Sequence, residues 1–175
     1  MAQTDRTGRV AERIQVVANV CVIAAALLFV CSISWLFLRQ YTSMRVSHSS
    51  ISKGTKITLP EFNWSLSSQS LLLVLSTECK YCSASTPFYR RLVNQARLTP
   101  KTRLLAIFPQ AVNESREYFA KHDVKLDTVR QAVPASLGVK GTPTLILVDT
   151  NGVVIQSWDG MVPPEVENEI LALLK

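Results

Sequence analysis

An apolar run, a pair of cysteines and a helical pattern follow one another in the middle of this chain. Residues 71–75 are consecutive apolar residues, which is typical of a strand covered on both faces of its sheet. Cys79 and Cys82 come next, and the pattern from Ser83 to about Arg97 predicts a helix. A helix start offers unpaired N–H groups and a positive dipole end, which favour the thiolate that carries out thiol–disulfide exchange. The stretch therefore predicts a redox-active cysteine pair.

A pair of cysteines can serve other chemistries, and the rest of the chain argues against them. A zinc site needs further ligands at similar spacing, but the two remaining cysteines lie in an apolar segment, and His48 and His122 are far apart. Residue 83 is serine, so the haem-attachment pattern is absent. A structural or inert pair is the alternative. We expect no metal and no bound cofactor, because the Cys79–Cys82 disulfide itself would carry the electrons.

An apolar segment near the N-terminus predicts a single transmembrane helix. Residues 16–38 contain no Asp, Glu, Lys or Arg, and a helix needs about 20 apolar residues to cross a bilayer core. A cleaved signal peptide would have a shorter apolar region and a small-residue cleavage site. We therefore divide the chain into an N-terminal tail over 1–13, a transmembrane helix over 14–39, a polar linker over 40–60 and a domain over 61–175.

The charges beside this segment barely distinguish its two possible orientations. Arg6, Arg9 and Arg13 precede it, and Arg39 and Arg45 follow it. We expect the N-terminus in the cytoplasm and the domain on the periplasmic or extracytoplasmic side of the inner (cytoplasmic) membrane. The reasons are that a short tail stays inside readily and that disulfide chemistry suits an oxidising space.

The C-terminal part of the chain predicts an α/β fold. Apolar runs alternate with helical patterns there, and such crossover units place strands parallel to one another. The stretch 149–152 is a strong hairpin signal, which adds antiparallel strands, so we expect a mixed sheet with helices on both faces. After the helix of the cysteine pair, the expected elements are a strand over Arg103–Phe108, a helix from Asn113 as N-cap to about His122, a helical turn reaching Leu137, strands over 144–148 and 153–158, and a final helix after Pro163-Pro164.

Several landmarks of this domain occur together. The cysteine pair stands at a strand-to-helix turn, and Pro87 lies in the following helix. Gly141-Thr142-Pro143-Thr144 leads into a strand, and Asn151-Gly152 with Gly160 marks the closing hairpin. Together they resemble the thioredoxin fold, and most of all the membrane-anchored thioredoxin-like proteins of bacteria that act on disulfides outside the cytoplasm. The resemblance covers about residues 61–175 and implies a thiol–disulfide oxidoreductase.

The resemblance and the local chemistry agree on the roles of the two cysteines. Cys79, at the helix start, is the expected nucleophile, and Cys82 is expected to resolve the mixed disulfide. Lys80 would stabilise a thiolate at Cys79 and Glu78 would oppose it, so the sequence leaves the thiol pKa open. Tyr81 joins these modulating residues as a candidate border of the substrate groove, although plain packing is the simpler interpretation of its ring.

The proline loop is the expected substrate-binding element. The resemblance implies a cis Thr142–Pro143 bond, which would present the Thr142 backbone to an extended substrate segment. An ordinary loop proline is the alternative. The expected partners are protein thiols or disulfides, a transmembrane electron donor and the membrane itself. The net charge is +6, but no basic run is interleaved with aromatic residues, so we expect no nucleic-acid partner.

Two departures from the family pattern affect this interpretation. The buried acid that the family carries before its first cysteine is Leu73 here, which argues against efficient general reductase activity. The segment between the second strand and the proline loop is long, and its additional helix, around 115–122, is a candidate partner surface.

Two other functions stay open at this point. Thiol peroxidases resemble this fold but carry a proline and a threonine upstream of the reactive cysteine, where this chain has Leu72 and Ser76. The other is a non-catalytic thioredoxin-like module that docks a partner or delivers a metal. The copper-delivery relatives use a wider cysteine spacing with a distant histidine, a pattern that this chain lacks. The direction of electron flow does not follow from these residues, because reductases, oxidases and isomerases share them.

Overall fold

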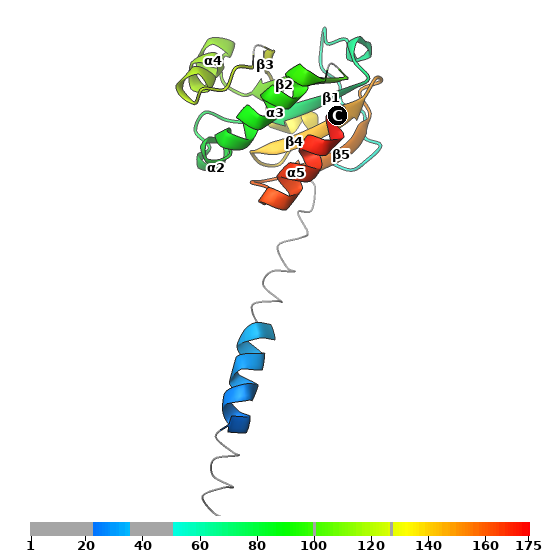
Figure 1. Cartoon of the computed structure of the whole chain (residues 1–175). Coiled ribbons are helices and arrows are strands. Elements are labelled where there is room, and N and C mark those ends of the chain that lie inside the picture. The colour runs from blue at the N-terminus through cyan, green and yellow to red at the C-terminus, as the bar shows by residue number, and fades with distance from the viewer. Residues whose placement is uncertain (1–22, 36–50, 100, 127) are drawn as a thin grey trace, which may run out of the picture. The chain divides into compact units, whose positions relative to one another are not determined.

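The computed structural model describes residues 23–35, 51–99, 101–126 and 128–175. These residues belong to two units, a helix over residues 23–35 and an α/β domain, and each is described by itself (Figure 1). Within the described ranges, no helix has the length and apolar character that crossing a membrane requires. The transmembrane helix predicted over 14–39 extends past the described helix at both ends, so that prediction lies partly outside these ranges.

The α/β domain alternates strands with helices, and the elements expected from the sequence are present with slightly shifted ends. From the sequence, residues 124–129 are either a short strand or a loop, and the short strand β3 begins at the end of this stretch. In chain order the elements are η1 (Trp64–Leu66), β1 (Gln69–Val74), α2 (Lys80–Ala84), α3 (Thr86–Leu98), β2 (Thr102–Phe108), α4 (Val112–Lys121), β3 (Val129–Gln131), η2 (Pro134–Leu137), β4 (Thr144–Asp149), β5 (Val154–Asp159) and α5 (Pro164–Leu173).

The strands form one mixed five-stranded sheet in the order β3-β2-β1-β4-β5. β1 is parallel to β2, and β2 is parallel to β3. β1 is antiparallel to β4, with Val74 opposite Thr144, and β4 is antiparallel to β5. The central place of β1 explains its unbroken apolar run, because it has a strand on each side and a packed layer on each face. The end of β1, where the cysteine turn begins, therefore lies beside the start of β4.

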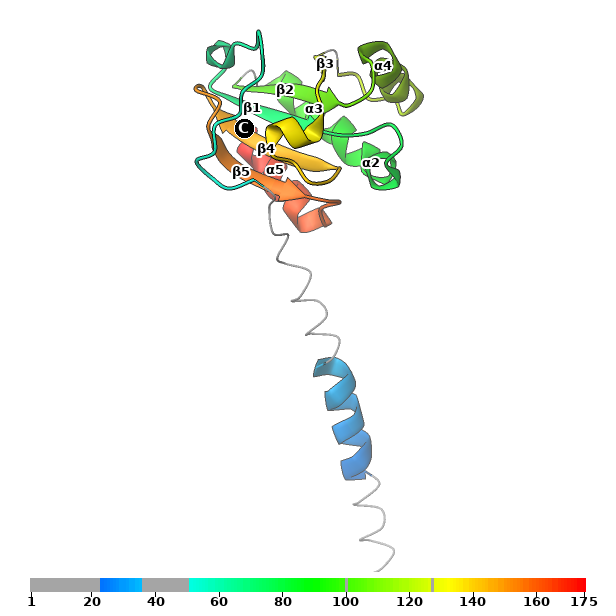
Figure 2. The ribbon, with the colours of Figure 1, turned by 180° about the vertical axis from the view of Figure 1, so that it is seen from behind.

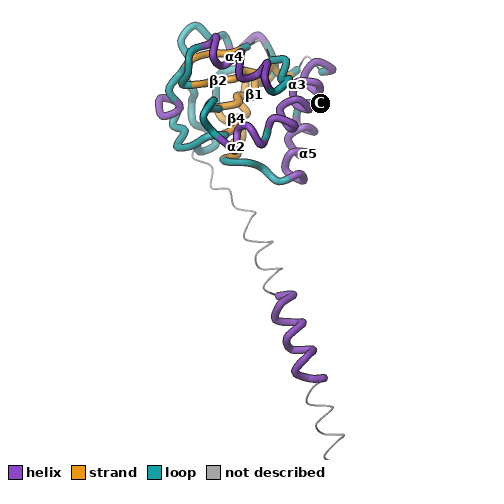
Figure 3. Tube along the Cα trace, turned by 90° about the vertical axis from the view of Figure 1, so that its left-hand side faces the viewer, coloured by secondary structure: helices purple, strands orange, loops and turns teal. Residues whose placement is uncertain are grey.

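Two apolar layers cover the sheet. On one face, α3 and α5 pack over alternate residues of β1, among them Leu71 and Leu73 (Figures 1 and 3). On the other face, Leu72 and Val74 join a layer formed with η2 and the segment before β1 (Figure 2). The alternation follows from the pleat of the strand. The predicted mixed sheet flanked by helices is confirmed, although a 3-10 turn and an N-terminal segment, rather than long helices, cover the second face.

The polar linker predicted over 40–60 ends earlier than expected. Ile51 and Ile57 are buried in the second apolar layer, and the Gly54 N–H donates a hydrogen bond to the Val154 carbonyl at 2.8 Å. These contacts attach the segment to β5 at the edge of the sheet. Two separated isoleucines in a polar stretch are too sparse a pattern to indicate burial. The domain therefore begins before its predicted boundary.

Two helices differ in detail from the sequence prediction. The helix predicted from Ser83 onward is two helices, α2 and α3, which meet at Ser85. Pro87 lies in the first turn of α3, where its missing N–H removes no helical hydrogen bond. The prediction of Asn113 as N-cap is wrong, because that residue already lies inside the first turn of α4. The N-cap is Ala111, whose side chain makes no capping hydrogen bond.

Candidate functional site: a cysteine pair beside a cis-proline loop

The pairing of β1 with β4 brings two distant stretches of the chain together. Val74 ends β1 opposite Thr144, the first residue of β4, so the turn after β1 and the loop before β4 share one edge of the sheet. The Thr142–Pro143 peptide bond is cis, as predicted. The Cys79 sulfur lies 3.2 Å from the Thr142 carbonyl oxygen. The expected nucleophile and the expected substrate-binding loop therefore form one site.

Cys79 is the N-cap of the helix that carries both cysteines. Its half-buried sulfur accepts a hydrogen bond from the Cys82 N–H at 3.1 Å. Burial tends to raise the pKa of Cys79, but hydrogen bonds from the Cys82 thiol, the Thr142 side chain and the Cys82 and Tyr81 backbone outweigh burial and lower the pKa. The Thr142 carbonyl favours the protonated thiol, since a carbonyl only accepts. The donors prevail, so the thiolate is favoured.

Cys82 lies in the interior and has no exposed surface. Burial, together with the hydrogen bond and the charge of Cys79, raises the pKa of Cys82 to about 12, against smaller opposite effects from Ser76 and Thr142. Both cysteines are free thiols in this structure. At neutral pH Cys79 has the larger thiolate fraction and is open to solvent, while Cys82 is protonated and shielded. This is the asymmetry that an attacking and a resolving cysteine require.

The three residues expected to modulate the site lie on its exposed side. Glu78 and Lys80 are exposed, and half of the Tyr81 side chain is in solvent. The Lys80 ammonium lies 4.9 Å from the centroid of the Tyr81 ring, within range of a cation–π contact. Neither Lys80 nor Glu78 is among the main causes of the lowered pKa of Cys79. Hydrogen bonds, rather than these two charges, set the direction of that shift.

A hydrogen-bond network that sequence analysis missed holds the turn before Cys79. Gln110 donates its side-chain N–H to the Ser76 hydroxyl at 3.1 Å and accepts the Thr77 backbone N–H at 3.4 Å. The Thr77 hydroxyl donates to the Glu114 carboxylate at 2.8 Å. Glu114 lies on α4, so the additional helix supports the cysteine turn. No spacing rule links these positions, because their contact depends on the pairing of β1 with β2.

The interior beneath the cysteines is apolar apart from a few hydroxyl groups. Leu73 is fully buried there, in the layer that contains the resolving cysteine. The Tyr118 and Ser83 hydroxyls share a hydrogen bond at 3.2 Å. The Ser85 and Tyr89 hydroxyls are buried and have no hydrogen-bond partner among the described residues. Sequence analysis missed this group because its hydroxyls lie among buried apolar residues and follow no motif.

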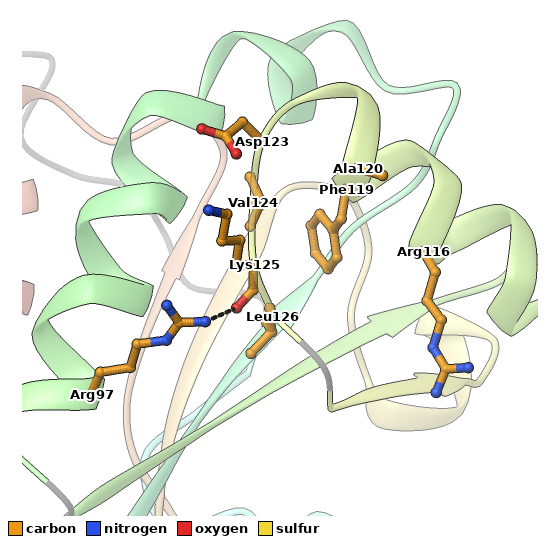
Figure 4. Close-up of a pocket in the computed structure, with 8 residues that line it drawn as sticks. All are labelled: Arg97, Arg116, Phe119, Ala120, Asp123, Val124, Lys125 and Leu126. Carbon is orange, nitrogen blue, oxygen red and sulfur yellow. Dashed lines mark hydrogen bonds between the residues drawn. The ribbon is translucent and has the colours of Figure 1, made fainter.

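A hollow of about 650 Å³ lies elsewhere, beside α3 and α4 (Figure 4). Arg97, Arg116 and Lys125 line it together with Asp123 and the apolar side of Phe119. The Arg97 guanidinium donates to the Lys125 carbonyl at 3.0 Å. None of the residues predicted for the site lines this hollow. The two sulfurs of unequal pKa and the cis-proline loop are the chemically distinctive groups that the fold brings together, so we place the candidate site at the cysteine pair.

Comparison with known proteins gives the class to which this fold and site belong. The family model described as a thioredoxin-like domain matches residues 66–175. The chain therefore belongs to the thioredoxin-like family, and the family predicted from the sequence is confirmed. A search of curated protein sequences gave no match.

Solved structures agree with this fold. A protein from Chlorobium tepidum assigned as the thiol:disulfide interchange protein DsbE is 24% identical, covers 71% of this chain and 99% of its own, and superposes with a TM-score of 0.56. A thiol:disulfide interchange protein from Bacteroides sp. is 17% identical, with 71% and 91% coverage and a TM-score of 0.55. StoA from Bacillus subtilis is 10% identical, with 66% and 86% coverage and a TM-score of 0.52.

Proposed function

We propose that this protein is a thiol–disulfide oxidoreductase that exchanges disulfides with protein substrates through Cys79 and Cys82. The observation that carries the proposal is the difference between the two sulfurs. The accessible Cys79 has a lowered pKa, and the buried Cys82 a raised one, within a single turn of chain beside the proline loop. A zinc site or an inert disulfide gives no reason for one accessible thiol to be activated while its neighbour is suppressed.

In the reducing direction, the Cys79 thiolate attacks one sulfur of a substrate disulfide. A new bond joins Cys79 to the substrate, and the other substrate sulfur leaves as a thiolate. Cys82 then gives up its proton and attacks the Cys79 sulfur, so that the Cys79–Cys82 disulfide forms and the second substrate sulfur leaves. Two electrons pass from the cysteine pair to the substrate. The Cys82 proton and the proton that Cys79 released to solvent on ionising are taken up by the two substrate sulfurs. The reverse sequence oxidises a substrate dithiol.

The substrate in this proposal is an extended polypeptide segment. Pro143 precedes β4, and Thr142 presents its backbone beside the reactive sulfur. An extended segment that hydrogen-bonds to this backbone would bring its own disulfide against Cys79, as an added strand does at a sheet edge. The half-exposed Tyr81 ring, two residues after Cys79, offers a further apolar contact.

Catalysed reduction of insulin by dithiothreitol tests the proposed activity. We expect the full-length protein to accelerate the reaction, and Cys79→Ser to reduce the rate at least about 100-fold, to background, because the attacking thiolate is gone. Cys82→Ser should lose turnover as well, since its mixed disulfide is not resolved. Cys31→Ala, which changes an exposed cysteine in the N-terminal helix, is the matched control and should retain full activity. Equal activity in Cys79→Ser would refute the proposal.

We propose further that residues 14–39 anchor the chain in the inner membrane, with the domain on the periplasmic or extracytoplasmic side. The support is the uncharged run of residues 16–38, whose length suits a bilayer. A membrane-impermeant alkylating reagent on intact cells tests this placement, with Cys79→Ser as the control. Labelling of Cys79 without reductant would favour a pair that a transmembrane donor keeps reduced. Labelling only after a reductant would favour an oxidase, and labelling only after lysis would contradict the placement.

A further inference from the structure

Two buried hydroxyl groups lie on the helix face that carries Cys82. Tyr89 has no exposed surface and Ser85 almost none, and neither hydroxyl has a hydrogen-bond partner among the described residues. A buried polar group without a partner is costly, and native interiors contain few of them. A pair of such groups on the helix face that carries a reactive sulfur therefore calls for an explanation in terms of function.

The backbone keeps these side chains aligned with the sulfur. Cys82, Ser85 and Tyr89 stand at positions i, i+3 and i+7, which share one face of a helix. The Ser85 N–H donates to the Tyr81 carbonyl at 3.0 Å, and the Tyr89 N–H donates to the Ser85 carbonyl at 3.2 Å. Helical hydrogen bonds thus run across the junction of α2 and α3, and they keep the face continuous in spite of the break at Ser85.

The electrostatics couple the Tyr89 hydroxyl to the sulfur. Burial raises the pKa of Tyr89 far above its ordinary value, and a negative charge on Cys82 raises it further. The Ser85 hydroxyl lowers the pKa of Tyr89, although the two groups do not meet hydrogen-bond geometry in this structure. Tyr89 therefore stays protonated at any physiological pH. It can donate a hydrogen bond to an anion, but it cannot act as a base.

The resolving step needs such a donor. Cys82 must become a thiolate in a buried apolar layer that also contains Leu73, a side chain that offers no polar atom. We propose that the Tyr89 hydroxyl stabilises the Cys82 thiolate while it attacks the Cys79–substrate disulfide, and that Ser85 positions this hydroxyl. The proton that Cys82 loses goes to the departing substrate thiolate, and Tyr89 keeps its own. This inference rests on the proposed function, because it assigns residues to the second half of that reaction.

An aromatic disulfide separates the two halves of the reaction. Full-length protein carrying Cys21→Ala and Cys31→Ala is reduced, freed of reductant, and mixed with 5,5′-dithiobis(2-nitrobenzoate). Attack by Cys79 releases one thionitrobenzoate, and attack by Cys82 on the mixed disulfide releases the second. Stopped-flow absorbance therefore follows the two steps as two phases, without any protein substrate.

Tyr89→Phe should slow the second phase about tenfold at pH 7 and raise its apparent pKa by about one unit, since one unit is a tenfold change in thiolate fraction. The first phase should not change, because Cys79 is activated by other donors. Ser85→Ala should slow the second phase about threefold, the smaller effect that a residue acting through Tyr89 would have. Ser70→Ala removes a buried hydroxyl at the opposite end of β1 and should leave both phases as in the parent protein.

Two results would overturn the inference. One is a second phase in Tyr89→Phe with the parent rate and pH profile. The other is an equal slowing of both phases at unchanged apparent pKa, which would indicate a structural role. Should Tyr89→Phe fail to fold, the pH profile of Ser85→Ala decides in the same way. Two release phases in a parent protein that does not reduce insulin would refute the proposed function alone.

Discussion

The sulfur of Cys79 lies 3.2 Å from the carbonyl oxygen of Thr142, a residue 63 positions later in the chain. This contact exists because Val74 and Thr144 are opposite each other in the antiparallel pair β1–β4. It joins the cysteine turn to the proline loop and fixes the surroundings in which the thiol ionises. The reactivity of the site therefore depends on sheet register as well as on the CxxC motif.

The two cysteines should differ strongly in their reactivity with pH. The pKa of Cys79 is lowered by hydrogen-bond donors, and burial raises the pKa of Cys82 to about 12. Because only the thiolate is alkylated, iodoacetamide should modify Cys79 below its ordinary titration range and leave Cys82 unmodified until the pH exceeds about 10. Mass spectrometry of the reduced protein after alkylation between pH 5 and 11 gives both curves. Superimposable curves would contradict the assignment of roles.

Cys82 should make the reduced domain less stable at alkaline pH. Its folded-state pKa lies above the unfolded value of about 8.5. The protonated Cys82 thiol therefore makes its full contribution to the free energy of unfolding below that pH, and this contribution is lost as the pH rises towards 12. Cys79 has a lowered pKa, so its effect on stability changes with pH in the opposite direction. We therefore make the comparison in protein that carries Cys79→Ser. There, Cys82→Ala should cost about 2 kcal/mol less at pH 10 than at pH 8, because the unfolded thiol titrates over this range and the folded thiol does not. Urea unfolding at both values measures this, and a pH-independent difference would refute it.

Tyr89→Phe should leave the domain as stable as before or make it more stable. The variant keeps the ring in the core and removes a buried hydroxyl that has no partner among the described residues. Removing an unsatisfied polar group is worth roughly 1 kcal/mol. Urea unfolding at pH 7 is the measurement. A loss of stability of that size would show that the hydroxyl has a structural partner, and would weaken the role proposed for it in catalysis.

Gly152 should tolerate alanine far less well than Gly54. Both have positive φ, 76° and 88°, so each alanine incurs a left-handed cost of about 1–2 kcal/mol. A Cβ at Gly152 would also lie 2.7 Å from the Trp64 indole nitrogen, whereas a Cβ at Gly54 would meet nothing within 4 Å. Displacing that ring should add about 1–3 kcal/mol to the loss at Gly152.

Urea unfolding of Gly152→Ala and Gly54→Ala gives the two losses, and a change in tryptophan emission should accompany only the first. Equal losses would show that Trp64 gives way without cost. The comparison concerns the packing of the hairpin alone and does not depend on any assigned activity.

The order of strands and helices could be predicted because each element has a local pattern. β1 is mostly an unbroken apolar run, and the hairpin strands β4 and β5 flank a strong turn signal at Asn151-Gly152. Element ends were less predictable. Asn113 has a side chain that is common at N-caps, but α4 begins one residue before it, at Val112. Ala111 is the N-cap, and its side chain makes no capping hydrogen bond. Caps of this kind depend on the loop that precedes the helix.

The cysteine pair and the proline loop could be recognised from spacing, whereas their supporting residues could not. Gln110 and Glu114 reach the cysteine turn only because β2 lies beside β1. Tyr89 belongs to a stripe that is apolar along most of its length, so its hydroxyl gave no signal of its own. Ile51 and Ile57 were assigned to a linker because burial against β5 depends on the folded sheet.

Trapping of the mixed disulfide tests the central claim most directly. Reduced Cys82→Ser protein is mixed with a disulfide-containing protein such as insulin, quenched with acid and separated without reductant. The account predicts a one-to-one covalent adduct through Cys79. Dithiothreitol should reduce its disulfide and separate the two proteins, and Cys79→Ser should form no adduct. No adduct from Cys82→Ser, or an equal adduct from Cys79→Ser, would contradict the assignment of Cys79 as the attacking and Cys82 as the resolving cysteine.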